Sequence, residues 1–403
     1  MKWETYKLKE LCSEIVDCVN KTAPTSDVPT PYKMLRTSDI REGKINLENL
    51  NCVTKEVYEK WTRRGKLQKG DVIFTREAPL GEVGLVREEK NYFLGQRLVL
   101  FRANDKICDG RFLMYSLLWH DNKQAIISKG VGSTVAHLRV PECENIEIKA
   151  PDLDIQHRIA DILSAYDDLI ENNQKQIKLL EEATQRLYKE WFVDLHFPGH
   201  ENTKIVDGVP EGWNWCKLED AIQFDPKVTL TKERMKQFVP MSALSTASMM
   251  LDESQFTETS SNSGSKFQNG DTLLARITPC LENGKTAYVS GLKSDEGAVG
   301  STEYIVMRAK TINSYMVYLL ARTDDFRQSA INSMSGSDGR QRVKSDKLKM
   351  LDYLHPTSEL VEKFENVEEP IFEKIYRLSE QMQQAKQARD LLLPKLMRGE
   401  VEV

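Results

Sequence analysis

The sequence lacks paired cysteines, paired histidines and long apolar runs. Its seven cysteines form no Cys-x-x-Cys pair and its six histidines show no His-x-x-x-His spacing, so neither a disulfide framework nor a zinc site is indicated. No run approaches the roughly 18 apolar residues that a membrane helix needs. The amino terminus, MKWETYKLKE, has no features of a targeting signal. Scattered thiols are typical of cytoplasmic proteins, which is the location we expect.

Motifs for phosphate binding and catalysis are also missing. Gly284, Lys285 and Thr286 would complete a phosphate-binding loop only if residue 279 were glycine, and it is proline. The stretch GVGST at 130–134 has no third glycine and no clear strand and helix around it, so a flexible loop is expected. The GxSxG, HExxH and EF-hand spacings do not occur. We therefore expect no catalytic residues in this chain and no metal site.

The sequence contains enough apolar residues to form more than one hydrophobic core. It has 403 residues, of which 40% are hydrophobic and 29% charged, and two or three domains are expected at this length. The net charge of -5 argues against a simple polycation that binds acidic partners through charge alone.

The clearest signal is an internal repeat with an offset between 204 and 210 residues at all but one of its matches. Trp3 to Leu8 matches Trp213 to Leu218, GQRLVLFRA matches GSTEYIVMRA, and GVGSTVAHLRV matches SGSDGRQRV. KGDVIFTREA at 69–78 likewise matches NGDTLLARIT at 269–278. Pro151 matches Pro356. Five weak matches in the same order indicate two copies of one plan.

Each copy begins with a sheet-led α+β module, predicted at 1–150 and 197–357. Short runs such as DVIFT, LVLFRA, DTLLARI and EYIVMRA are rich in β-branched and aromatic residues and are separated by turn residues. Short helices are predicted within 110–128 and 313–333, where apolar residues recur at intervals of three and four residues. The Gly-Asp pairs are predicted to form the turn that enters a strand in both modules.

Each copy then continues as one long helix, predicted at 151–196 and 358–403. An apolar stripe with spacings of three and four indicates a coiled-coil seam on an otherwise charged helix. Because such a stripe needs a partner, we expect the two helices to pair antiparallel as a spacer of roughly 60 Å between two modules, related by a pseudo-twofold axis. Asn173 either lies at the slack edge of this seam or selects its register. The predicted seam residues are Tyr166, Ile170, Asn173, Ile177, Leu180, Leu187, Ile371, Ile375, Leu378 and Met382.

Two similar but unequal modules on a rigid spacer suit the recognition of two sites on one partner. Equivalent major-groove faces of duplex DNA recur about every 34 Å, so two modules could address two half-sites. The weak overall charge implies that binding affinity is supplemented by partner proteins.

These features resemble the specificity (S) subunit of type I restriction-modification systems, and the resemblance covers the whole chain. It rests on the helix and its entry at 151–192, on FPGHE and DGVPEGW between 197 and 213, and on ARDLLLPKLMRGEVEV at 388–403. The central pattern is formed by Pro151, Leu153, Gln156 and Ile159. The second copy has no glutamine at the matching place in PTSELVEKFENV.

The resemblance implies a non-catalytic subunit whose two target recognition domains each read one half of a gapped, asymmetric DNA target. It implies that the helices dock two modification subunits, which carry S-adenosylmethionine and methylate adenine. It further implies restriction subunits that use ATP and Mg²⁺, with no cofactor bound by this chain itself.

Candidate DNA-contacting residues are polar and basic side chains on predicted loops. Arginine suits guanine, glutamine suits adenine, and serine and threonine suit phosphates or either base. Arg76 and Arg276 could instead pair with nearby acids, and the GRQR stretch at 339–342 is the strongest candidate. The predicted set is Arg36, Thr37, Ser38, Arg63, Arg64, Thr75, Arg76, Gln96, Arg97, Ser133, Thr134, Ser242, Arg276, Ser301, Thr302, Arg340, Gln341 and Arg342.

Two alternative functions stay open on the sequence alone. One is a scaffold in which the modules bind protein or glycan, and the other is an enzyme whose active site shows no known motif. An adenine methyltransferase gene beside this one would distinguish the DNA-reading function from both.

Overall fold

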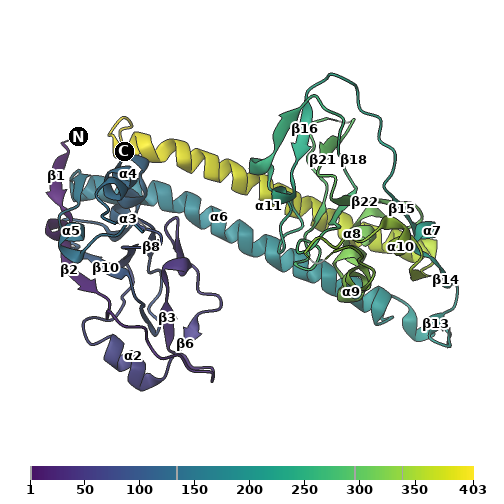
Figure 1. Cartoon of the computed structure of the whole chain (residues 1–403), viewed down its shortest axis with the longest axis horizontal. Helices are drawn as coiled ribbons and strands as arrows, with labels where there is room; N and C mark the ends of the chain where they lie inside the picture. Colours follow the sequence, from purple (N-terminus) through teal and green to yellow (C-terminus); the bar gives the residue numbers. More distant parts are fainter. Residues whose placement is uncertain (1, 133–134, 295, 338) are drawn as a thin grey trace. The chain divides into compact units, whose positions relative to one another are not determined.

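The computed structural model describes residues 2–132, 135–294, 296–337 and 339–403, and the chain folds into two compact units. Unit 1 comprises Met1–Ile170 and Gln384–Val403, and unit 2 comprises Glu171–Gln383. Two long helices, α6 (Leu153–Tyr188) and α11 (Ser358–Met397), each contribute to both units (Figure 1). Among the described residues, no helix is long and apolar enough to span a membrane.

Unit 1 is built on a four-stranded antiparallel sheet with the order β2-β10-β7-β8. A second sheet, β6-β3-β9, contains the parallel pair β3 and β9, and two smaller sheets pair β1 with β11 and β4 with β5. The strands are β1 (Glu4–Lys7), β2 (Cys12–Asp17), β3 (Lys33–Leu35), β4 (Ile40–Arg41), β5 (Lys44–Ile45), β6 (Asn51–Cys52), β7 (Val72–Thr75), β8 (Val83–Leu85), β9 (Tyr92–Leu94), β10 (Leu98–Ala103) and β11 (Glu147–Ala150).

Short helices cover the main sheet of unit 1. Helix α3 (Gly110–Leu118) starts where Asp109 accepts hydrogen bonds from the amides of Arg111 and Phe112, which satisfies two free amides of the first turn. Its apolar face joins the core that β7 and β10 form. The other helices are α1 (Leu8–Leu11), α2 (Lys55–Trp61), α4 (His120–Ser128) and α5 (Val140–Glu144), with a 3-10 turn at Thr37–Asp39.

Unit 2 repeats this plan, which confirms the predicted repeat. Its main sheet has the order β15-β22-β19-β20, and its second sheet, β17-β16-β21-β18, again contains one parallel pair, β16 and β21. The strands are β12 (Ile205–Val206), β13 (Val209–Pro210), β14 (Asn214–Lys217), β15 (Ile222–Phe224), β16 (Lys236–Val239), β17 (Thr257–Thr259), β18 (Ser265–Phe267), β19 (Thr272–Ala275), β20 (Thr286–Tyr288), β21 (Ala298–Gly300), β22 (Tyr304–Ala309) and β23 (Asp352–His355).

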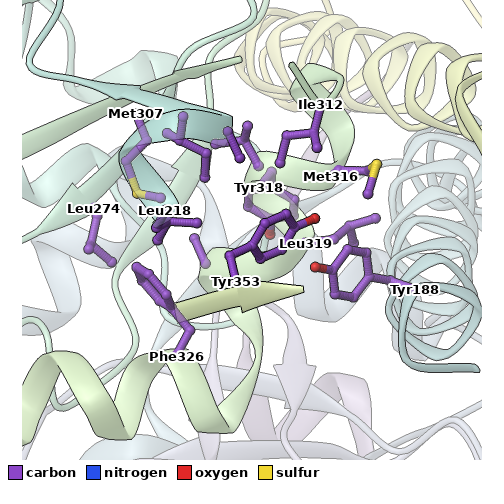
Figure 2. Packing of buried hydrophobic residues seen from close by; sticks show 14 of the residues in the cluster. Tyr188, Leu218, Leu274, Met307, Ile312, Met316, Tyr318, Leu319, Phe326 and Tyr353 are labelled. Atoms are coloured by element: carbon purple, nitrogen blue, oxygen red, sulfur yellow. The ribbon is translucent and has the colours of Figure 1, made fainter. Parts of the chain in front are cut away.

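The helices of unit 2 pack on its main sheet around one large core. Figure 2 shows Met316, Leu319 and Tyr318 of α8 directed into this core beside Tyr353 and Tyr188. As predicted, short helices occupy 110–128 and 313–333, with two in each region. The helices are α7 (Leu218–Ala221), α8 (Ser314–Arg322), α9 (Asp324–Asn332) and α10 (Ser345–Lys349), with 3-10 turns at His200–Asn202, Met241–Ala243 and Glu253–Gln255.

Helices α6 and α11 pack antiparallel within each unit, as predicted. In unit 1, Arg389 of α11 donates to Asp167 of α6 at 2.6 Å. In unit 2, the rings of Tyr188 of α6 and Phe364 of α11 lie with centroids 6.1 Å apart. Helix α11 continues through Pro370, although proline removes a backbone hydrogen bond from a helix interior. The neighbouring Phe364, Phe372 and Ile375 are buried in the core of unit 2, and this packing holds the helix together.

The seam between the helices buries more polar side chains than the apolar stripe in the sequence predicts. Asn173 is 1% exposed and its amide donates to Leu378 O at 3.3 Å and to Gln381 Oε1 at 3.0 Å. It therefore lies inside the seam, which favours the register-selecting interpretation. Of the predicted seam residues, those buried are Ile170, Asn173, Ile177, Ile375 and Leu378, while Tyr166, Leu180, Leu187, Ile371 and Met382 are half-buried. Polar side chains buried along the same helices are Asp167, Glu181, Thr184, Glu368 and Ser379.

Candidate nucleic-acid interface

Equivalent turns enter the central strands β7 and β19. Gly70 and Gly270 have φ of +92° and +88°, a left-handed conformation that favours glycine. The carboxylates of Asp71 and Asp271 accept hydrogen bonds from the amides of Gln68 and Gln268, at 2.7 Å and 2.8 Å. The Gly-Asp pairs are thus scaffold, and they fix where each strand ends and where the next loop begins.

The loop arginines that follow these strands have different surroundings. Arg76 pairs with Asp17 at 3.1 Å and also donates to Leu138 O at 3.2 Å. This agrees with the alternative interpretation of the sequence, in which Arg76 pairs with a nearby acid. The Arg276 side chain makes no ion pair or hydrogen bond with the described residues, and its buried Nε, like that of Arg76, has no hydrogen-bond partner among them. It lines a groove in unit 2.

A second position carries opposite charges in the two units. In unit 1, Arg97 lies just before β10 and pairs with Glu77 at 3.3 Å. In unit 2, Glu303 lies just before β22 and accepts three hydrogen bonds of 2.7 to 3.0 Å from Arg342. These bonds, followed by the charge of Arg342, lower the pKa of the Glu303 carboxyl. The two units therefore present different charges on similar backbones.

The groove of unit 2 has a volume of about 650 Å³. Its basic lining residues are Lys227, Lys232, Lys266 and Arg276, and its one acidic lining residue is Asp225. The buried Lys236 supports one wall, because its ammonium donates to Thr231 O at 2.9 Å and bonds to the side chain of Asn262. The excess of positive charge suits an anionic ligand such as a phosphate backbone.

Most of the remaining candidates in unit 1 are held by contacts within the protein. Arg36 pairs with the buried Asp39 at 2.8 Å, and Arg64 donates to Cys18 O at 3.0 Å. Thr75 is fully buried and its hydroxyl donates to Pro79 O at 2.6 Å, so it offers no surface to a ligand. Gln96 accepts a hydrogen bond from Thr22 at 3.0 Å.

Other candidates differ in how accessible they are. Arg63 and Ser38 are exposed, and Thr37 is half-buried. In unit 2, Ser242 and Thr302 are exposed, while the Ser301 hydroxyl accepts a hydrogen bond from the Glu303 amide. Ser133 and Thr134 lie outside the described residues.

The two arginines of the GRQR stretch differ in their contacts. Arg340 is exposed and its side chain makes no ion pair with the described residues, whereas Arg342 is tied to Glu303. Gln341 is half-buried, and its carbonyl accepts from the Thr278 amide at 3.1 Å. Of this stretch, Arg340 is the side chain best placed to meet a ligand.

The sequence analysis missed the lysines of the groove. Lys227 and Lys232 lie on the loop between β15 and β16, and Lys266 lies on β18. The run DPKVTLTKER carries a local basic excess, but single surface lysines are common and the run gives no sign of the groove.

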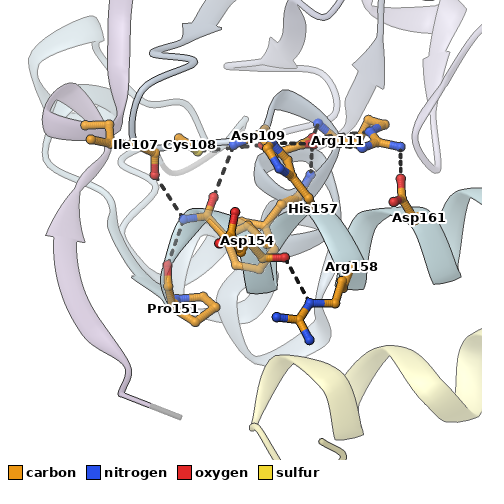
Figure 3. A network of polar contacts seen from close by, with 11 residues as sticks. Ile107, Cys108, Asp109, Arg111, Pro151, Asp154, His157, Arg158 and Asp161 are labelled. Atoms are coloured by element: carbon orange, nitrogen blue, oxygen red, sulfur yellow. Dashed lines mark hydrogen bonds and ion pairs between the residues drawn. The ribbon is translucent and has the colours of Figure 1, made fainter. Parts of the chain in front are cut away.

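Gln156 ties the entry of α6 to the main body of unit 1 (Figure 3). Its amide group donates to Ile107 O at 3.0 Å and to Pro151 O at 2.8 Å, and its carbonyl accepts from the Asp109 amide at 3.1 Å. Every hydrogen bond is buried or half-buried, so glutamine at this position is required by packing. In unit 2 the side chain of Asn313 caps α8 and donates to Val361 O at 3.2 Å, which makes the matching connection without a glutamine.

Comparisons with known proteins agree on one family. A model described as type I restriction modification DNA specificity domain matches residues 1–182. The chain is 26% identical over 345 residues to the type I restriction enzyme MjaIX specificity subunit of Methanocaldococcus jannaschii, a match that covers 83% of this chain and 78% of that protein.

The chain is similar to type I restriction specificity subunits. It is also 36% identical over 143 residues to the EcoAI specificity subunit of Escherichia coli, covering 34% of this chain and 24% of that protein. The crystal structure of an S subunit from M. genitalium shares its fold, with a TM-score of 0.61 at 15% identity over 98% of this chain and 96% of that one. Among the described residues, no group of three or more histidine, cysteine or carboxylate side chains is placed to hold a metal ion.

Proposed function

We propose that this chain is a specificity subunit that selects the DNA sequence on which a type I restriction-modification complex acts, and that each unit reads one half of a gapped, asymmetric target. In this proposal residues 1–150 and 197–357 are target recognition domains. The match of residues 1–182 to a type I restriction modification DNA specificity domain, the similarity to specificity subunits and the repeated fold support it. The observation that carries it is that the two units share a backbone plan but differ in the charged side chains at corresponding strand ends, as Arg97 and Glu303 do.

The weak overall charge of the chain supports a role for partner proteins. Neutralised phosphates supply most of the non-specific affinity for DNA, and this chain has a net charge of -5. In the proposal, the helical segments 151–196 and 358–403 dock two modification subunits, which would supply the further phosphate contacts. These subunits would carry S-adenosylmethionine and methylate adenine in each half-site, and restriction subunits would use ATP and Mg²⁺.

The test is to co-express this chain with an adenine methyltransferase subunit of a type I restriction-modification system that assembles with it, in cells free of other adenine methylation, and to map the methylated adenines. We expect one gapped motif with two different halves. The matched control is the methyltransferase without this chain, which should give no such motif. Assembly of an intact complex that methylates no new sites would contradict the proposal.

A further inference from the structure

Arg76 and Arg276 occupy the same place in the two units. The Arg76 amide donates to Arg97 O at 2.8 Å and the Arg276 amide to Glu303 O at 3.0 Å. Their carbonyls accept from the amides of Leu138 and Val343, at 3.0 Å and 2.9 Å. Because the backbone is held alike at both arginines, any difference between them comes from the surrounding side chains.

In unit 1 those surroundings neutralise the arginine. Asp17, the last residue of β2, lies 3.1 Å from the Arg76 guanidinium, and Leu138 O accepts a further hydrogen bond from it. The Arg76 side chain is 18% exposed. A ligand could engage it only by breaking this pair.

In unit 2 the nearby acids are committed elsewhere. Strand β15 ends at Phe224, and the Asp225 carboxylate that follows accepts from the Val306 amide at 3.1 Å and from the Ser345 hydroxyl. Glu303 is engaged by Arg342. The buried Nε of each arginine lacks an acceptor in the described part of the chain, although buried donors are nearly always satisfied. The units differ because the rest of the Arg76 guanidinium is engaged by Asp17 and Leu138 O, whereas the Arg276 guanidinium makes no ion pair or side-chain hydrogen bond with the described residues.

The unpaired arginine faces the groove of unit 2. Lys227 and Lys232 on the groove are exposed, and Lys266 is half-buried. An ammonium is a point charge that suits a phosphate, whereas a guanidinium presents a fixed fork that matches two acceptors in one plane. The O6 and N7 atoms of guanine in the major groove are such a pair of acceptors.

We propose that Arg276 is a specificity-determining residue that donates to the edge of a guanine in the half-site read by unit 2. Lys227, Lys232 and Lys266 hold the flanking phosphates, and Arg76 contacts no base. This inference rests on the proposed function, and it assigns one residue and one base type within it.

The test uses the full chain in complex with its methyltransferase partner, with mapping of methylated adenines as the measurement. Arg276→Ala and Arg276→Lys should both relax one guanine position in one half of the motif, because lysine keeps the charge but loses the fork. The loss of discrimination expected from one such contact is roughly 5- to 150-fold. Lys227→Ala should lower methylation at every site and leave the motif unchanged.

Arg76→Ala is the matched control, and its complex should methylate the same motif as the wild type. Co-purification with the methyltransferase shows that each variant folds and assembles, and Arg276→Lys keeps the test informative if the alanine variant does not. An assembled Arg276→Lys complex with an unchanged motif would overturn the assignment. So would a uniform loss of methylation in Arg276 variants without relaxation at any base, which would indicate a phosphate contact. If the wild type produces no gapped motif, the proposed function itself fails.

Discussion

Arg308 donates hydrogen bonds of 2.6 Å and 2.7 Å to the two carboxylate oxygens of Asp271, which is 1% exposed. In unit 1, Arg102 makes the same two-point contact with Asp71 at 2.8 Å and 2.9 Å. The pair ties the turn before one central strand to the end of its neighbour. Two of the matched stretches of the repeat therefore meet in one contact. The aspartate of the Gly-Asp turn supplies the acceptor, and the arginine of the Arg-Ala pair at the end of the neighbouring strand of the sheet supplies the donor.

Asp271→Ala should destabilise unit 2 by about 2 to 4 kcal/mol, because it leaves the Arg308 guanidinium without its buried partner. Unfolding in denaturant, followed by hydrogen exchange of the unit 2 amides, would measure this. Glu373→Gln is the control, since its helix pair with Arg377 is largely exposed and should contribute less than about 0.5 kcal/mol. Equal effects of the two substitutions would contradict the structural role of Asp271.

Gln156→Ala should destabilise unit 1 by about 1 to 3 kcal/mol, because the Asp109 amide and two carbonyls lose a buried partner. Protection of the α6 amides near residue 156 from hydrogen exchange should fall with it. Gln387→Ala, on the exposed face of α11 in the same unit, is the control and should change stability little. A Gln156→Ala variant as stable as this control would show that the network contributes nothing.

Glu368 should make the stability of unit 2 depend on pH. Its carboxyl is fully buried on α11 and both oxygens lack a hydrogen-bond partner among the described residues. Burial raises its pKa from 4.5 to about 7. The folded state therefore keeps the proton on this carboxyl up to a higher pH than the unfolded state does. The free energy of unfolding should be highest below about pH 4.5 and should fall as the pH rises to about 7.

Above that pH the ionised Glu368 costs about 3 kcal/mol. Glu368→Gln should therefore be more stable than the wild type at pH 8 and similar to it at pH 5, as measured by denaturant unfolding at both values. Glu369→Gln, at the next and exposed position of α11, is the control and should follow the wild type. If Glu368→Gln keeps the wild-type pH dependence, another group must be responsible for it.

The sequence was sufficient for the repeat, the sheet-led modules and the paired helices, because these depend on local periodicity. Apolar spacing also located the seam, but it gave no sign that Glu368 is buried while the apolar Val367 beside it is 40% exposed. A rule that reads only apolar residues cannot detect a buried carboxylate. Helix rules would likewise end α11 at Pro370, where packing against the core of unit 2 outweighs the lost hydrogen bond.

The loop side chains were harder to predict, because their accessibility depends on partners far away in sequence. Arg76 and Arg276 look equivalent in the sequence, yet Asp17, 59 residues away, engages only the first. Arg342 belongs to the strongest predicted stretch but is held by Glu303. A positive charge on a predicted loop identifies a candidate, and only the folded chain shows which candidates remain free.

The reversed ion pairs at the strand ends restrict how this protein can be re-engineered. Copying Glu303 into unit 1 as Arg97→Glu would place a second carboxylate beside Glu77, and copying Arg97 into unit 2 as Glu303→Arg would place a second guanidinium beside Arg342. Residues transferred one at a time between the units would thus create like-charge contacts. The smallest segment that can be exchanged between the units is therefore the loop together with the residue of opposite charge that pairs with it.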